Sequence, residues 1–168
     1  MKKILTVLMT MLLALSVLTV FNVKQVYAVA ALSDEGASLI LDTVISDQAK
    51  DTSVKLALFC TDVTPTDTTT YASYTWCAGS VGETPKTLTI GVDWTISGAA
   101  PPQAAYTQQD FSFTGDLTTN PTIYGYCLTN SIATITYGCE QLTSPFTPHN
   151  GYHLYITPIV KLSTGTPS

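Results

Sequence analysis

The stretch LTIGVDWTI, residues 88–96, carries the clearest fold signal in this 168-residue chain. Apolar residues alternate with small or polar ones through all nine positions. A period of two is typical of a β-strand with one buried and one exposed face. We therefore predict one continuous strand here, whose buried face carries Leu88, Ile90, Val92, Trp94 and Ile96.

Similar runs occur on both sides of this stretch. Residues 54–60 alternate in the same way, and further strands are expected at residues 106–113, 123–129, 132–137 and 152–162. Tight turns are predicted at Asn130-Ser131 and, as a hairpin, at Asn150-Gly151. Pro158 in the last run indicates an edge position or a bulge. This spacing of short strands predicts an all-β fold, a single antiparallel β-sandwich of jelly-roll or Ig-like type.

One short N-terminal helix is expected at residues 32–45. Ser33 is a suitable N-cap, and the acids Asp34 and Glu35 fall in the first turn, where the helix dipole favours them. The apolar stripe of this helix is expected to pack on its own domain; contact with a partner is the alternative.

Residues 1–28 resemble an export signal. Lys2 and Lys3 precede an apolar run over residues 4–21, and small residues at Ala28 and Ala30 offer two cleavage sites. We expect cleavage to leave a single domain, residues 29–168, that is secreted or at the cell surface. An uncleaved membrane anchor is the alternative, because the run is about long enough to span a bilayer.

The charge balance bears on the choice of partners. Residues 29–168 hold four lysines, no arginine and twelve acids, a net charge of −8. Nucleic-acid binding depends on cations that neutralise phosphates, so it is not expected. Binding of the processed domain to an anionic membrane is not expected for the same reason.

The four cysteines are Cys60, Cys77, Cys127 and Cys139. An even number in an exported chain favours disulfides, and buried free thiols are the alternative. A tight turn at Asn130-Ser131 would leave Cys127 and Cys139 roughly 17 Å apart, too far to bond. Two pairings then remain open: Cys60–Cys127 with Cys77–Cys139, or Cys60–Cys139 with Cys77–Cys127.

No motif predicts catalysis, a metal or a cofactor. Eleven residues separate Cys127 from Cys139, too many for a zinc finger, and His149 and His153 flank a predicted turn. The segment AGSVG, residues 78–82, resembles a nucleophile elbow around Ser80, but no helix pattern follows it. Asp62 and Asp67 are expected to form turns rather than a calcium site.

Three aromatic residues, Tyr71, Tyr74 and Trp76, cluster in one loop-like stretch. Exposed aromatic rings can stack on sugars or anchor a protein partner. Packing within the domain is the expectation, and glycan binding by these residues is the alternative.

Several motifs resemble small structural proteins of tailed phages and environmental viruses. They are LD at residues 41–42, LALFCTDVTPTD at 56–67, YTQQDFSF at 106–113, IYGY at 123–126 and LYITP at 154–158. Their order and spacing agree with that family over residues 33–162. The resemblance implies a non-enzymatic virion component, a decoration or tail-associated protein whose partners are other virion or surface proteins or further copies of itself.

Two features depart from that family, namely the export signal and the four cysteines. Export does not fit simple assembly in a bacterial cytoplasm. Either a cell has captured this protein for its surface, or the virus assembles by an unusual route. A secreted or cell-surface adhesion module that binds glycans is therefore the alternative function.

Overall fold

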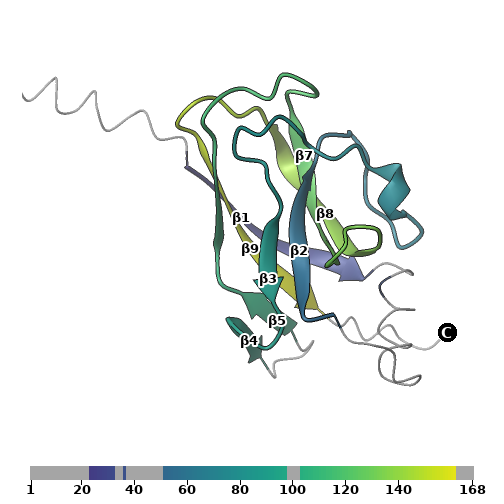
Figure 1. Ribbon diagram of the computed structural model, residues 1–168. Helices are drawn as coiled ribbons and strands as arrows, with labels where there is room; N and C mark the ends of the chain where they lie inside the picture. Colours follow the sequence, from purple (N-terminus) through teal and green to yellow (C-terminus); the bar gives the residue numbers. More distant parts are fainter. Residues whose placement is uncertain (1–22, 33–35, 37–50, 98–102, 162–168) are drawn as a thin grey trace, which may run out of the picture.

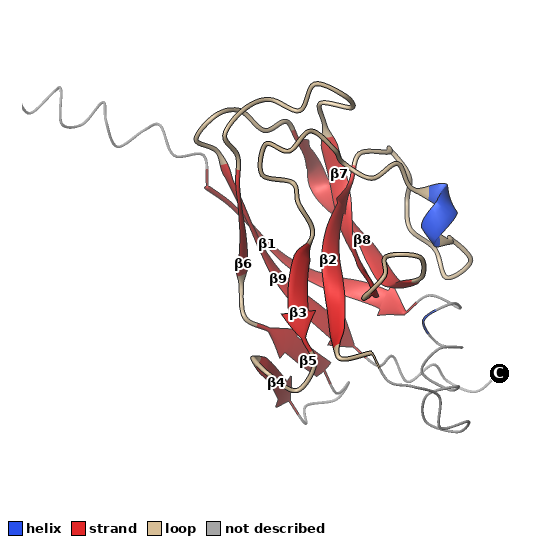
Figure 2. Ribbon diagram, in the orientation of Figure 1, coloured by secondary structure: helices blue, strands red, loops and turns tan. Residues whose placement is uncertain are grey.

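The computed structural model describes residues 23–32, 36, 51–97 and 103–161, and residues 23–32 by their backbone path alone. It is nearly all β, as the alternating sequence predicts (Figure 2). The predicted helix at residues 32–45 lies outside the described residues, apart from Gly36 and from Leu32, which ends a strand.

Two layers of antiparallel strands form the sandwich (Figure 1). The first sheet has the order β3-β2-β7-β8, and the second has β4 and β5 beside β9, with β6 also against β9. Their bounds are β2 Ser53–Phe59, β3 Lys86–Thr89, β4 Trp94–Ser97, β5 Gln103–Tyr106, β6 Gln109–Ser112, β7 Ile123–Asn130, β8 Thr136–Phe146 and β9 His153–Lys161.

Strand β1, Val23–Leu32, connects the two sheets. It runs parallel to β9 from Val23 to Ala30, and its last two residues, Ala31 and Leu32, pair with β8 in antiparallel orientation. The β1–β9 pair is the one parallel pair among the described strands. Because β1 lies between β8 and β9, the Asn150-Gly151 turn does not close a hairpin, contrary to prediction.

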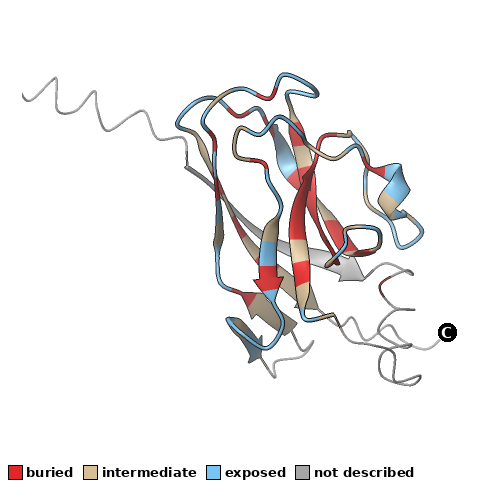
Figure 3. Cartoon of the chain, viewed as in Figure 1, coloured by how far each residue is buried: buried red, intermediate tan, exposed pale blue. Residues whose placement is uncertain are grey.

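The main core fills the space between the sheets, as the buried segments in Figure 3 show. Alternate residues of β2 point into it, as their spacing predicts. The fully or almost fully buried apolar side chains of this core are Leu56, Leu58, Leu88, Phe111, Phe113, Leu117, Ile123, Tyr126, Leu128, Leu154 and Ile156.

The predicted strand at residues 88–96 is broken, and this prediction is wrong. The chain leaves the first sheet after β3, turns through Gly91 and Asp93, which both have positive φ, and enters the second sheet as β4. Leu88 is fully buried, whereas Ile90, Val92 and Ile96 are exposed. An even alternation cannot reveal that a chain changes sheets, because each half keeps its own period of two.

Other boundaries also differ from prediction. The expected strand at residues 106–113 is two short strands, β5 and β6, and the strand expected from residue 132 begins at Thr136. Pro158 is not at an edge, contrary to one of the two predictions for it, because β9 has neighbours on both sides. It lies where the partner of β9 changes from β6 to β5, and the extra residue of this irregularity is in the partner segment between Ala105 and Gln109, not in β9 itself.

Candidate functional site

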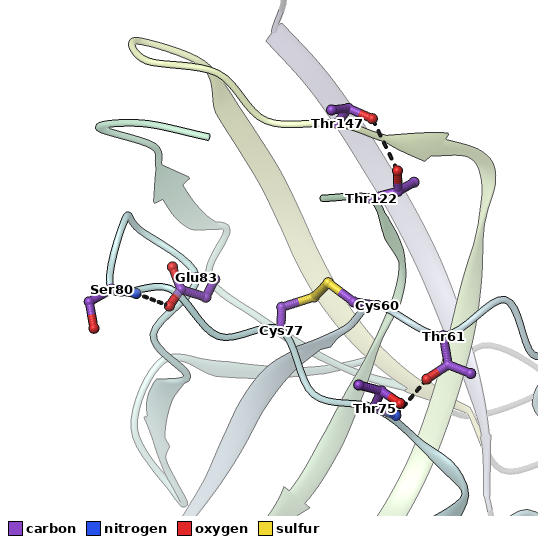
Figure 4. Close-up of a disulfide and its surroundings, with 8 residues drawn as sticks. All are labelled: Cys60, Thr61, Thr75, Cys77, Ser80, Glu83, Thr122 and Thr147. Carbon is purple, nitrogen blue, oxygen red and sulfur yellow. Dashed lines mark hydrogen bonds between the residues drawn. A yellow bond between two sulfur atoms is a disulfide. The ribbon is translucent and has the colours of Figure 1, made fainter. Parts of the chain in front are cut away.

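A disulfide between Cys60 and Cys77 closes the loop that leaves β2 (Figure 4). The two Cα atoms are 5.2 Å apart. The Cys60 N–H donates to the Thr75 carbonyl at 2.7 Å, and the Cys77 N–H donates to the Leu58 carbonyl at 3.0 Å. The returning segment therefore continues the first sheet for a few residues beside the end of β2, and the disulfide fixes it there. We call residues 60–77 the stapled loop.

The second disulfide joins Cys127 to Cys139 across neighbouring strands, at a Cα separation of 4.0 Å. Both pairings left open by the sequence are therefore wrong, and so is the exclusion of Cys127–Cys139. The β7–β8 connection is longer than a tight turn, since Thr129 faces Thr136 instead of Ile132. A bulge after Leu128 adds one more residue, which places Cys139 directly opposite Cys127.

The side chain of Asn130 holds this wide connection in place. Its Oδ1 accepts hydrogen bonds from the N–H groups of Thr134 at 2.8 Å and Ile135 at 3.1 Å. Asp51 binds the same loop from outside, since it accepts a hydrogen bond from the Ser131 hydroxyl at 2.8 Å. Asparagine often accepts hydrogen bonds from backbone N–H groups a few residues further along the chain, and so it favours a loop. Asn130 therefore predicted a loop at this position, but it did not predict the length of that loop.

A second, smaller core lies on the outer face of the first sheet. It consists of Phe59, Tyr74 and the Cys127–Cys139 disulfide, with Trp76 packed partly against it. Gly125 opposes Phe59 in the sheet, and a Cβ there would overlap the Phe59 ring and the Glu140 carbonyl. The missing side chain thus makes room for the ring that supports the stapled loop.

The loop extends across β7 and is fixed to β8. Gln141 donates from its amide to the Asp62 carboxylate at 3.0 Å and accepts from the Thr64 hydroxyl at 3.2 Å. Asp62 therefore makes a long-range contact with β8 instead of the local turn contact expected for it, whereas Asp67 does accept a local hydrogen bond, from the Thr68 N–H at 2.9 Å. The stapled loop therefore contacts the outer face of the first sheet on β2, β7 and β8.

The three predicted binding aromatics form one stack that leads outward from this small core. Tyr74 contacts Phe59 with 4.8 Å between ring centroids, Trp76 follows at 5.5 Å, and Tyr71 stacks on Trp76 at 4.5 Å. Tyr74 is only 6% exposed. Burial also raises the pKa of the Tyr71 hydroxyl. Tyr74 is thus a packing residue, as expected, whereas Tyr71 and Trp76 are only partly buried.

The backbone around Ser80 donates hydrogen bonds to the carboxylate of Glu83, three residues further along the chain. The Glu83 carboxylate, which is buried, accepts a hydrogen bond from the N–H group of Ser80 (Figure 4) and another from the N–H group of Val81 at 2.8 Å. Burial alone would raise the pKa of Glu83, but four backbone N–H groups between residues 79 and 83 outweigh it and lower the pKa. The Ser80 hydroxyl points away from this carboxylate in Figure 4.

Each histidine is paired with an aspartate, which the sequence did not reveal. His149 Nδ1 lies 2.8 Å from Asp116, and His153 Nδ1 lies 3.0 Å from Asp110. The partners are 33 and 43 residues apart in sequence, so the fold brings them together, the first pair between two loops and the second between β6 and β9. Within the described ranges, no group of three or more His, Cys, Asp or Glu residues could hold a metal ion.

Large apolar residues are exposed where the chain changes sheets. Ile90 and Val92 are about half exposed and Ile96 is 79% exposed. They lie in the turn after β3 and in β4, at one end of the sandwich (Figures 1 and 3). We call Ile90, Val92 and Ile96 the β4 patch. Several large apolar side chains exposed close together in the sequence are a candidate for an interaction surface.

No family model matches this sequence, and no curated protein and no solved structure shows significant similarity to it. Among the residues described, no helix is long and apolar enough to cross a membrane. The two disulfides are compatible with a secreted or extracellular protein.

Proposed function

We propose that this protein is a non-enzymatic structural component of virion type, which assembles through contacts between copies of itself. The β4 patch supports this proposal most directly. Three large apolar side chains are exposed within seven residues, although their spacing in the sequence is that of a buried strand face. The family resemblance, which also implies a protein–protein role, points in the same direction.

Two of the strands that have a single described partner, β3 and β4, are protected to different degrees. Both β3 and β4 pair with one strand only among the described residues. Pro85 and Lys86 stand at the β3 edge, and residues of these kinds discourage pairing with another strand. The stretch 88–97 has neither lysine nor proline and only one charge, Asp93. The β4 edge therefore retains the features of a strand that accepts a neighbour.

We expect the edge of β4 to pair with the edge of β4 in a second copy of the chain. Any strand can pair with its own copy in antiparallel orientation across a two-fold axis, because such an interface is self-complementary. A register centred on Ile96 brings the two Ile96 side chains together on one face. Both exposed isoleucines then become buried by the pairing that satisfies the backbone of β4.

Sedimentation velocity of the oxidised full-length protein in mild detergent tests this proposal. We expect a concentration-dependent change from monomer to dimer, which Ile96→Lys abolishes. Ile132→Lys is the matched control, since Ile132 is 72% exposed but lies in the β7–β8 loop. Equal association of both variants and the wild type would refute a contact through β4.

Glycan binding is the second candidate, favoured by the partly exposed Tyr71–Trp76 stack on a disulfide-closed loop. Glycan-array binding by the oxidised protein tests it. Binding that is lost in Tyr71→Ala, with an unchanged melting temperature, would support this function. Absence of binding to every glycan on the array would leave the stack a packing feature.

A further inference from the structure

The strand that connects the two sheets contains both predicted cleavage sites. Ala28 and Ala30, after which a signal peptidase was expected to cut, lie inside β1, Val23–Leu32. The same ten residues therefore have two incompatible roles. They are either the end of a removed leader or a structural strand of the domain.

Most of the pairing of β1 lies before the first site. Residues Val23 to Ala28 face His153 to Pro158 of β9, and only Val29 and Ala30 continue this parallel ladder. Cleavage after Ala28 would remove six of the eight paired positions, and cleavage after Ala30 would remove all eight. The pairs that remain in the latter case are Ala31 with Cys139 and Leu32 with Gly138.

The loss would fall on a strand at the centre of the fold. β9 has β1 on one side and β5 and β6 on the other, and its Leu154 and Ile156 are fully buried in the main core. Without residues 23–28, the backbone groups on one edge of β9 lose the neighbour that pairs with them (Figure 1). Unpaired buried backbone groups are costly, and a long open edge invites aggregation.

We infer that residues 23–28 are retained in the folded protein, and that the apolar segment at residues 4–21 tethers the domain to a lipid bilayer. This apolar segment is 18 residues long and carries no charge, which is within the length needed to span a bilayer. Lys2 and Lys3 precede it and favour the cytoplasmic side for the N-terminus, which places the disulfide-bonded domain outside.

The tether leaves little distance between membrane and domain. Only Asn22 separates the apolar segment from β1 in the sequence. The inference replaces the expectation that the processed domain has no membrane partner. It does not depend on self-association through β4, so either proposal can fail without the other.

Two measurements on the full-length protein from its native host test this inference. The first is the intact mass of the protein in the membrane fraction that resists alkaline carbonate. We expect the unprocessed N-terminus in that fraction. A mature N-terminus at Val29 or Ala31, or any cleavage between residue 4 and Val23, would overturn the tether.

The second measurement is hydrogen exchange of the same preparation, followed on peptides that cover β1 and β9. We expect about every second backbone amide of residues 23–30, those that donate to β9, to exchange slowly, on the timescale of residues 153–158 in the partner strand. The matched comparison is the exposed turn at residues 149–150, which lies outside the β4 patch and should exchange rapidly. Exchange of β1 as fast as that turn would overturn its role as a structural strand.

Discussion

Substitution of Ile96 by lysine is the most informative perturbation of the proposed contact. Full burial of an isoleucine side chain contributes roughly 1.5–3 kcal/mol. Ile96 is 79% exposed, so its further burial in an interface is worth about 2 kcal/mol per copy. Two copies meet across a two-fold axis, and the change removes about 4 kcal/mol from dimerisation. The dissociation constant should rise about a thousandfold.

The assay is sedimentation equilibrium at several concentrations of the oxidised wild type, Ile96→Lys and Ile132→Lys. The far-ultraviolet spectrum and melting temperature of each should match, because neither position belongs to the core. We expect the wild type and Ile132→Lys to dimerise and Ile96→Lys to remain monomeric. A change of less than about tenfold in Ile96→Lys, worth about 1.4 kcal/mol, would refute the burial of Ile96 in the contact.

Four further predictions concern the stability of the domain, each checked by urea or thermal unfolding. Replacing both Cys127 and Cys139 by alanine should cost about 3 kcal/mol, since the disulfide closes a segment of 12 residues; a cost near zero would contradict this. Gly125→Ala should destabilise the domain by about 3 kcal/mol or more, because the new Cβ would overlap the Phe59 ring and the Glu140 carbonyl. Gly151→Ala is the control, since its Cβ meets no atom and the change should cost only the strain of a positive φ. Asn130→Ala should cost about 1–3 kcal/mol, because the N–H groups of Thr134 and Ile135 lose their acceptor; an unchanged midpoint would argue against that role. The pKa of Glu83 is lower in the folded state than in the unfolded state, where it is roughly 4.3, so the ionised carboxylate stabilises the fold above that pH. This stabilisation is lost as the pH falls through the folded-state pKa. Glu83→Gln should therefore lose this contribution to the pH dependence of the free energy of unfolding, and a pH dependence identical to that of the wild type would contradict it.

The sequence predicted the fold class because strand periodicity is a local property. β2, β7 and β9 lie where alternation and turn residues place them, and alternate residues of β2 and β9 enter the core, whereas a register shift after Ile123 interrupts the alternation in β7. The expected packing role of the aromatic residues also holds for Tyr74. These features depend on neighbours along the chain, which a single sequence displays directly.

The predictions failed where the structure depends on contacts between residues that are distant in the sequence. The period of two over residues 88–96 continues across Gly91 and Asp93, yet positive φ at both residues turns the chain into the other sheet. The disulfide assignment failed because one loop and one bulge together shift the register by five residues. A short error in register changes every cross-strand pair that follows it.

The histidine–aspartate pairs and the β4 patch could not be predicted from the sequence either. Asp110 and His153 meet because β6 and β9 pair, a fact of topology that no local motif records. The exposure of Ile96 depends equally on where the second sheet ends. The stapled loop, by contrast, had a visible signal in its two cysteines, although the sequence reasoning excluded the disulfide between them.

The central claim, association of copies through the edge of β4, is tested most directly by hydrogen exchange of the wild type at low and high concentration. The account predicts that backbone amides of residues 94–97 become protected as the concentration rises, while those of the β3 edge, residues 86–89, do not change. Exchange of β4 that is independent of concentration, in a sample shown to be associated, would contradict the claim.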